Sequence, residues 1–262
     1  MNIFRKIFKN KSLNQVGRSA KLILVSTVIF GALDSLWQLF YNLFVLSRGF
    51  GKEFLGLVNA MPYIGFLTFA VLAGIFTNRV GKRKALIIGL AVQISALALQ
   101  LILPSKILIL FSAFCVGAGL SLVIVSKLPL LHESSSKENQ ALIFSLNFAL
   151  YGFVGMGGNL VAGQLPALLA RLLNVPEGHA ITYQTVLIIS VLLGFLCILP
   201  IYKMKEETPK IDLLLQESEK HESAKFFDLL FSPLVIKLCL PCLTLGFGAG
   251  ILLPFMNVFF VE

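Results

Sequence analysis

Charged residues are scarce in this sequence: Asp, Glu, Lys and Arg make up 13% of the 262 residues, while hydrophobic residues make up 57%. Soluble domains carry about 25% charged residues. The composition therefore excludes an ordinary water-soluble protein and predicts a membrane protein. The formal net charge of +9 does not require a nucleic-acid partner, because basic residues also gather beside membrane spans.

Cysteine is also rare, and its pattern does not predict a disulfide framework. The four cysteines all lie in apolar stretches, at positions 115, 197, 239 and 242. Cys239 and Cys242 have the C-x-x-C spacing of zinc and redox sites, but no second pair and no nearby histidine accompany them. We interpret them as small buried residues and expect no metal site.

Histidine is rarer still, and nothing in the sequence predicts a catalytic site. His132, His179 and His221 all fall in predicted loops. A membrane enzyme would need convergent catalytic groups, yet neither a carboxylate pair nor an H-E-x-x-H motif is present. We therefore expect no enzymatic activity and no cofactor.

Long apolar runs dominate the rest of the chain. A helix needs about 20 apolar residues to cross a hydrocarbon core of about 30 Å. Seven runs reach that length, at approximately residues 22 to 46, 54 to 77, 85 to 103, 107 to 126, 141 to 165, 183 to 202 and 234 to 261. In a bilayer each run must satisfy its own backbone hydrogen bonds, and these lengths suit helices rather than the shorter strands of a barrel. The predicted fold is an all-α membrane protein with seven spans.

The distribution of Lys and Arg predicts the orientation. If the N-terminus is cytoplasmic, 18 of the 22 Lys and Arg residues fall on the cytoplasmic side. Such a bias places the N-terminus inside, so we expect a multi-pass protein of the cell membrane. Residues 1 to 21 form a basic cytoplasmic segment, either as a short amphipathic helix on the leaflet or as a disordered tail.

A short basic turn between the second and third runs carries the most specific pattern in the chain. Its key residues are Gly74, Asn78, Arg79, Gly81, Arg83 and Lys84. Their spacing resembles the G-x-x-x-D-R-x-G-R-R/K signature between helices two and three of major facilitator superfamily transporters, with Asn78 in place of the usual Asp. The basic side chains are drawn to anionic lipid head groups. The resemblance implies that the turn is a conformational switch, although an amide at position 78 cannot form the ion pair of a carboxylate.

The resemblance implies a carrier of twelve helices in two halves, each half being an inverted pair of three-helix repeats. Residues 22 to 202 match the first six-helix bundle, residues 203 to 233 a cytoplasmic linker, and residues 234 to 262 a seventh helix that starts a second half. No internal repeat in the sequence is strong enough to show the triplets independently. We therefore expect an incomplete or split carrier whose full activity needs a C-terminal half or a second copy.

Asp34 is the one acidic residue predicted to lie at mid-membrane, where an ionised Asp costs about 2.5–3.5 kcal/mol. Helical spacing gives it a polar face shared with Thr27, Gly31, Gln38 and Tyr41 or Asn42. We hypothesise that Asp34 binds a coupling proton or a cationic group of the substrate, with Gln38 and Asn42 lining the path. The alternative is a neutral Asp that only hydrogen-bonds to a neighbouring helix.

The fifth run has a second face of polar and small residues. Its members are Asn147, Tyr151, Gly155 and Gly158, with Gly163 following. Glycines so placed allow close helix packing, which is the interpretation we favour for these three, while Asn147 and Tyr151 are candidates for the substrate or proton pathway. Asn59 in the second run adds a further polar candidate.

The expected function is secondary active transport of a small solute by alternating access, with protons as the candidate coupling ion. Gly117 and Gly119 resemble the end of an R-x-x-x-G-x-G pattern of drug antiporters, but Ala113 occupies the arginine position, which weakens a drug-efflux assignment. The alternative is a non-transporting membrane remnant or scaffold subunit. A seven-helix receptor usually has its N-terminus outside, which disagrees with the charge bias. The substrate and the direction of transport stay open.

Overall fold

The computed structural model describes residues 17 to 176 and 179 to 204, together with isolated positions between 233 and 250. Within these residues the secondary structure is helical and no strand occurs. Six helices are long and apolar enough to cross a membrane: α2 (Arg18–Ser47), α3 (Lys52–Val80), α4 (Lys82–Ile102), α5 (Lys106–Glu133), α6 (Gln140–Ala162) and α8 (Ala180–Tyr202). The predicted all-α membrane class and its first six spans are confirmed.

The remaining predicted segments are described only in part. The chain divides into two compact units, residues 1 to 206 and 207 to 262, and all six spans belong to the first. The seventh predicted span lies largely outside the described residues, although described positions within it, such as Lys237 and Leu240, are helical. Cys239 and Cys242, most of the N-terminal segment and most of the 203 to 233 linker also lie outside the described residues.

The helices end where the sequence offers a turn residue. α3 and α4 are separated by Gly81 alone, whose φ of 94° lies in the region that favours glycine. α4 and α5 are joined by Leu103 to Ser105, and Ser105 is the N-cap position of α5. Such short connections force consecutive helices to run antiparallel.

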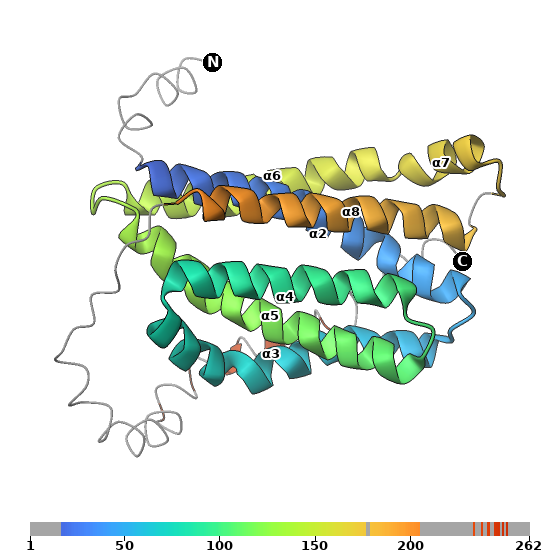
Figure 1. The fold of residues 1–262 in the computed structure, drawn as a ribbon, viewed down its shortest axis with the longest axis horizontal. Coiled ribbons are helices and arrows are strands. Elements are labelled where there is room, and N and C mark those ends of the chain that lie inside the picture. Colours follow the sequence, from blue (N-terminus) through green and yellow to red (C-terminus); the bar gives the residue numbers. More distant parts are fainter. Residues whose placement is uncertain are drawn as a thin grey trace. The chain divides into compact units, whose positions relative to one another are not determined.

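The six spans pack as two groups of three, which Figure 1 shows one above the other. α5 packs along both α3 and α4, while α2 packs along both α8 and α6. α4 and α8 provide the main contact between the groups. The polar face of α2 is thereby placed against α6, and this contact positions the candidate site.

The packing is symmetric under exchange of the first three spans for the last three. Replacing α2, α3 and α4 by α5, α6 and α8 turns the α3–α5 contact into the α6–α2 contact, and the α4–α5 contact into the α8–α2 contact. Because each triplet holds an odd number of spans, the second triplet enters the membrane from the opposite side. The bundle is therefore an inverted repeat, a relation that the sequence alone did not reveal.

Glycines bring α5 very close to α3 and α4. A Cβ at Gly117 of α5 would collide with the Pro62 carbonyl oxygen of α3 and lie 2.7 Å from the Phe66 backbone nitrogen. A Cβ at Gly119 would lie 2.7 Å from the Gln93 backbone nitrogen of α4. Contacts of this kind replace the hydrophobic effect as the source of helix association in lipid.

Several helix ends differ by a few residues from the predicted runs, and two differences and one added helix affect the connections. α5 continues to Glu133, beyond the predicted end of its apolar run at residue 126, so Lys127 lies within a membrane-length helix and not after its end. α6 ends at Ala162, a few residues before the predicted end. A short helix, α7 (Leu165–Leu173), then occupies part of the connection to α8 and ends at Asn174, whose φ of 53° is left-handed. Hydropathy marks where a chain is apolar, but a helix continues until its backbone hydrogen bonding is capped.

Candidate functional site

Asp34 lies at the centre of a polar contact between α2 and α6. The Tyr151 hydroxyl of α6 donates to Asp34 Oδ2 at 2.6 Å, and the Gln38 amide nitrogen donates to the same oxygen at 2.8 Å. Gln38 reaches Asp34 because residues four apart share a helix face, whereas Tyr151 is brought there by the packing of α6 on α2. Three of the predicted pathway residues therefore meet at one carboxylate oxygen.

The polar face of α2 makes further contacts on either side of Asp34. Toward the start of the helix, the Thr27 hydroxyl donates to Asn147 Oδ1 of α6 at 2.8 Å, and both side chains are buried. Toward its end, the Asn59 amide of α3 donates to Asn42 Oδ1 at 3.1 Å. The face thus contacts α6 along most of its length and α3 at its far end.

Tyr41 is the predicted pathway residue that the structure separates from this chain of contacts. It is only 6% exposed, and its ring stacks on Trp37 with centroids 4.8 Å apart. Its hydroxyl is buried without a hydrogen-bond partner in the described part of the chain. The geometry gives Tyr41 a packing contact and no link to Asp34.

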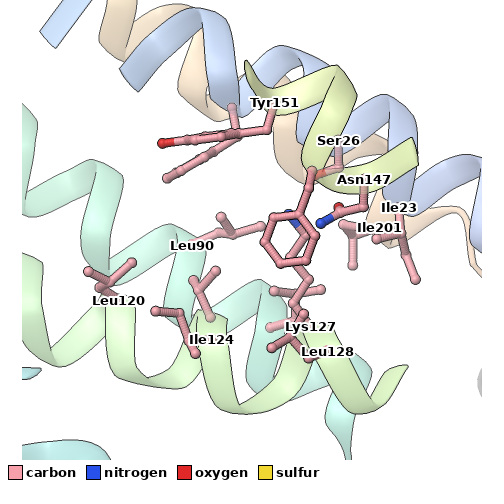
Figure 2. A pocket seen from close by; sticks show the side chains of 14 residues that line it. Ile23, Ser26, Leu90, Leu120, Ile124, Lys127, Leu128, Asn147, Tyr151 and Ile201 are labelled. Carbon is pink, nitrogen blue, oxygen red and sulfur yellow. The ribbon is translucent and has the colours of Figure 1, made fainter. Parts of the chain in front are cut away.

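A cavity of about 320 Å³ opens beside this polar face, between α2, α4, α5, α6 and α8. Figure 2 shows its lining, which is mainly Leu, Ile, Val and Phe. The polar side chains at its wall are Ser26, Lys127, Asn147 and Tyr151. Sequence analysis missed Lys127, because a lysine at the edge of an apolar run looks like the start of a basic loop.

The basic turn between α3 and α4 joins the helix ends on that side of the bundle. Lys82 forms an ion pair with Glu133 at the end of α5. The Arg83 guanidinium donates to the backbone oxygens of Ile201, at 3.3 Å, and Tyr202 at the end of α8, and it lies 5.8 Å from the Tyr202 ring centroid. The turn is therefore fastened to α5, within its own group of α3, α4 and α5, and to α8 of the other group.

The other residues of the predicted switch lie around this fastening. Asn78 and Arg79 are exposed near the end of α3, inside the helix rather than at its cap, and Lys84 is exposed in the first turn of α4. Gly74 is half-buried, and a Cβ there would meet nothing within 4 Å. Gly81 alone among the glycines of the motif has a backbone conformation that requires glycine.

The predicted packing glycines of α6 differ in their surroundings. Gly158 lies against the Ser35 side chain of α2, so a Cβ there would press on it. Gly155 has open space in the described part of the chain, and Gly163 faces only the preceding turn of its own helix. For these last two, a packing partner stays a prediction.

Six membrane-length helices in two inverted triplets define a multi-pass membrane protein, in which α2 and α6 are joined by the buried Thr27–Asn147 hydrogen bond and by the more exposed Asp34–Tyr151 hydrogen bond. The family model described as Major Facilitator Superfamily matches residues 22–262, and the chain belongs to this superfamily. It is therefore a transporter of the superfamily, for which the cargo is a small-molecule solute. No curated protein matches the chain in a direct comparison.

Proposed function

We propose that the chain moves its solute across the cell membrane by alternating access, as a secondary transporter, and that Asp34 takes up and releases the coupling proton. The observation that carries the proposal is the pair of donors, Tyr151 and Gln38, on a single oxygen of Asp34. Intramembrane carboxylates are costly and mark ion or proton pathways. A cationic group of the solute as the ligand of Asp34 is the second candidate from the same observation.

Protonation of Asp34 would change the contact between α2 and α6. An ionised carboxylate only accepts hydrogen bonds, so it can hold both donors. A protonated carboxyl carries a hydrogen on one oxygen and loses part of this accepting capacity. The Tyr151 contact across the two helices would then weaken, which couples the proton to the packing of α6 on α2.

The test is proton-coupled flux in liposomes that contain the purified protein and a pH-sensitive dye. Panels of organic acids, amines, sugars and amino acids are added outside, and solute-dependent proton movement is recorded. We expect Asp34→Asn to abolish the proton signal, because an amide cannot take up a proton. Glu138→Gln is the matched control, because Glu138 is exposed in the loop after α5 and its loss should leave the signal intact.

An Asp34→Asn variant with unchanged flux and unchanged pH dependence would remove the coupling role. Flux that persists but no longer discriminates against neutral analogues of a cationic solute would assign Asp34 to the solute instead. A folded protein with no flux for any member of the panel would favour the scaffold or remnant function. Assembly with a second copy or a separate half stays a prediction, which the molar mass of the purified particle tests.

The proposed orientation has a cytoplasmic N-terminus, so the basic turn faces the cytoplasm as a conformational switch. The contact of Arg83 with α8 supports the switch, because it joins the group of α3, α4 and α5 to the group of α2, α6 and α8 and must break if the two groups separate on that side. Lys84→Cys should react with an impermeant thiol reagent in inverted vesicles and not in intact cells. Reaction from the outside of intact cells would reverse the topology.

A further inference from the structure

Lys127 is a cation at the wall of the cavity and plays no part in the proposed proton pathway. It lies on α5, about 9 Å along the helix from Glu133 at a rise of about 1.5 Å per residue. Within the described part of the chain, no carboxylate forms an ion pair with its ammonium and no acceptor forms a hydrogen bond with it. A cation so placed is costly unless an anion reaches it.

The other polar groups of the cavity leave a second donor beside it. The Ser26 hydroxyl already donates to the Cys197 carbonyl oxygen at 2.8 Å, and the Tyr151 hydroxyl donates to Asp34. Asn147 accepts from Thr27 through Oδ1, so its amide N–H groups remain for the cavity. Figure 2 shows that Lys127 and Asn147 point into the same space from α5 and α6.

The remaining side chains that line the cavity are apolar and indicate that the uncharged part of the ligand is apolar too. Apolar side chains such as Leu90, Leu120 and Ile124 surround the two donors, and the cavity volume of about 320 Å³ admits only a small molecule. Small-molecule sites commonly combine an apolar wall with a few polar groups that fix orientation. A cation and an amide donor in such a wall match an anionic oxygen group attached to an apolar body.

We propose that this cavity binds a small apolar organic anion of the carboxylate class, with Lys127 as the ion-pair partner and Asn147 as the hydrogen-bond donor. The inference rests on the proposed transport function, since it names the class of solute. It also assigns the two charges to different tasks, with Lys127 holding the anion and Asp34 carrying the proton.

A lipid phosphate is another source of an anion for Lys127, because lysines near the ends of membrane helices extend toward the head groups. In this structure the side chain lines the cavity, which favours the solute. The experiment separates the two by measuring binding in neutral detergent without lipid, and again after adding phosphatidylglycerol.

The test is the thermal stability of the purified full chain with matched ligand pairs at pH 7. The probes are butyrate, octanoate, benzoate and 3-phenylpropionate, each beside its neutral amide and its primary amine. A ligand that binds only the folded state raises the Tm, and we expect a rise of about 2–4 °C for at least one acid at saturation. The amides and amines should give none.

Three variants test whether Lys127 is the residue that binds the anion. Lys127→Met should reduce the affinity for the responding acid by at least tenfold, while Lys127→Arg should retain most of it because the charge remains. Lys137→Met removes the same charge from the exposed loop after α5 and should leave the Tm rise unchanged.

The proposal is overturned if no acid raises the Tm, if the amides match their acids, or if Lys127→Met retains the response. It is also overturned if phosphatidylglycerol alone gives a Lys127-dependent rise and abolishes the response to the acids, because the anion is then a lipid. Since binding is measured without flux, a protein that binds the acid but does not move it would contradict the transport proposal and leave the binding site standing.

Discussion

The α3–α5 and α2–α6 contacts are equivalent in the inverted repeat, yet they are built from different chemistry. Between α3 and α5, Gly65 and Gly117 let the backbones approach so closely that neither position has room for a Cβ. Between α2 and α6, Thr27 and Asp34 instead form hydrogen bonds to Asn147 and Tyr151. The α3–α5 contact is formed by closely packed backbones, and the α2–α6 contact by hydrogen bonds between polar side chains.

The difference indicates where the bundle is rigid and where it can respond. Backbone contact through glycine is insensitive to protons and solutes, and it holds α5 against α3 and α4. Side-chain hydrogen bonds at Asp34 in the α2–α6 contact can exchange with water, protons or a ligand, because Asp34, Gln38 and Tyr151 are not fully buried. We infer that the α3–α5 contact is the scaffold and that the α2–α6 contact is the working surface.

The largest effect on stability is expected from adding a methyl group at the glycine contact between α3 and α5. Gly117→Ala should lower the free energy of unfolding by about 3 kcal/mol, the upper end of the usual overpacking cost, because the added Cβ meets the backbone of Pro62 and Phe66. Thermal unfolding in detergent measures the loss. Gly155→Ala is the control, since the space around its Cβ is open, and it should change stability by less than about 0.5 kcal/mol. Equal effects at the two positions would contradict the scaffold role.

A smaller effect is expected from the buried hydrogen bond between Thr27 and Asn147. Thr27→Val, Asn147→Leu and the double variant form a double-mutant cycle, for which we expect a coupling of about 0.6 kcal/mol, the average for hydrogen bonds between membrane helices. Chemical denaturation in mixed micelles provides the four stabilities. A coupling energy as large as the cost of Gly117→Ala would mean that the polar contact is as structural as the glycine contact.

The smallest effect on stability is expected at Tyr151. Tyr151→Phe removes one hydroxyl from a half-open site, so the Tm should change by about 2 °C or less, whereas proton-coupled flux should fall at least tenfold if the bond to Asp34 works in transport. Tyr63→Phe is the matched control, because Tyr63 is 72% exposed on α3. A Tyr151→Phe variant with normal flux would mean that the Tyr151–Asp34 hydrogen bond serves helix packing only and has no role in transport.

The sequence was sufficient to predict the six described spans and the polar face of α2. The spans follow from uninterrupted apolar runs, and the face follows because Asp34, Gln38 and Asn42 recur at helical spacing in an otherwise apolar helix. Tyr151 was also predicted as a pathway residue from its place on α6. Its bond to Asp34 was not, because no pattern within a single helix states which helix lies opposite.

The inverted repeat and Lys127 show what the sequence could not supply. The repeat is a relation between pairs of packed helices. It leaves no clear sequence similarity, because many apolar side chains suit the bilayer equally well and lipid-facing positions can diverge freely. Lys127 lies six residues before the end of α5, so its place inside the helix depends on where α5 stops. A hydropathy boundary is too coarse to decide whether such a lysine lies in a loop or at a cavity.

The most direct test of the working surface is whether water reaches the α2–α6 contact, since lipid or tight packing would exclude it. In a background whose four cysteines are replaced by alanine, Gln38→Cys is compared with Leu192→Cys, which lies among exposed apolar side chains of α8. A membrane-impermeant thiol reagent supplied both outside and inside the proteoliposomes should label position 38 at least tenfold faster than position 192. Equal, slow labelling of the two positions would contradict the claim that the α2–α6 contact is the working surface of the transporter.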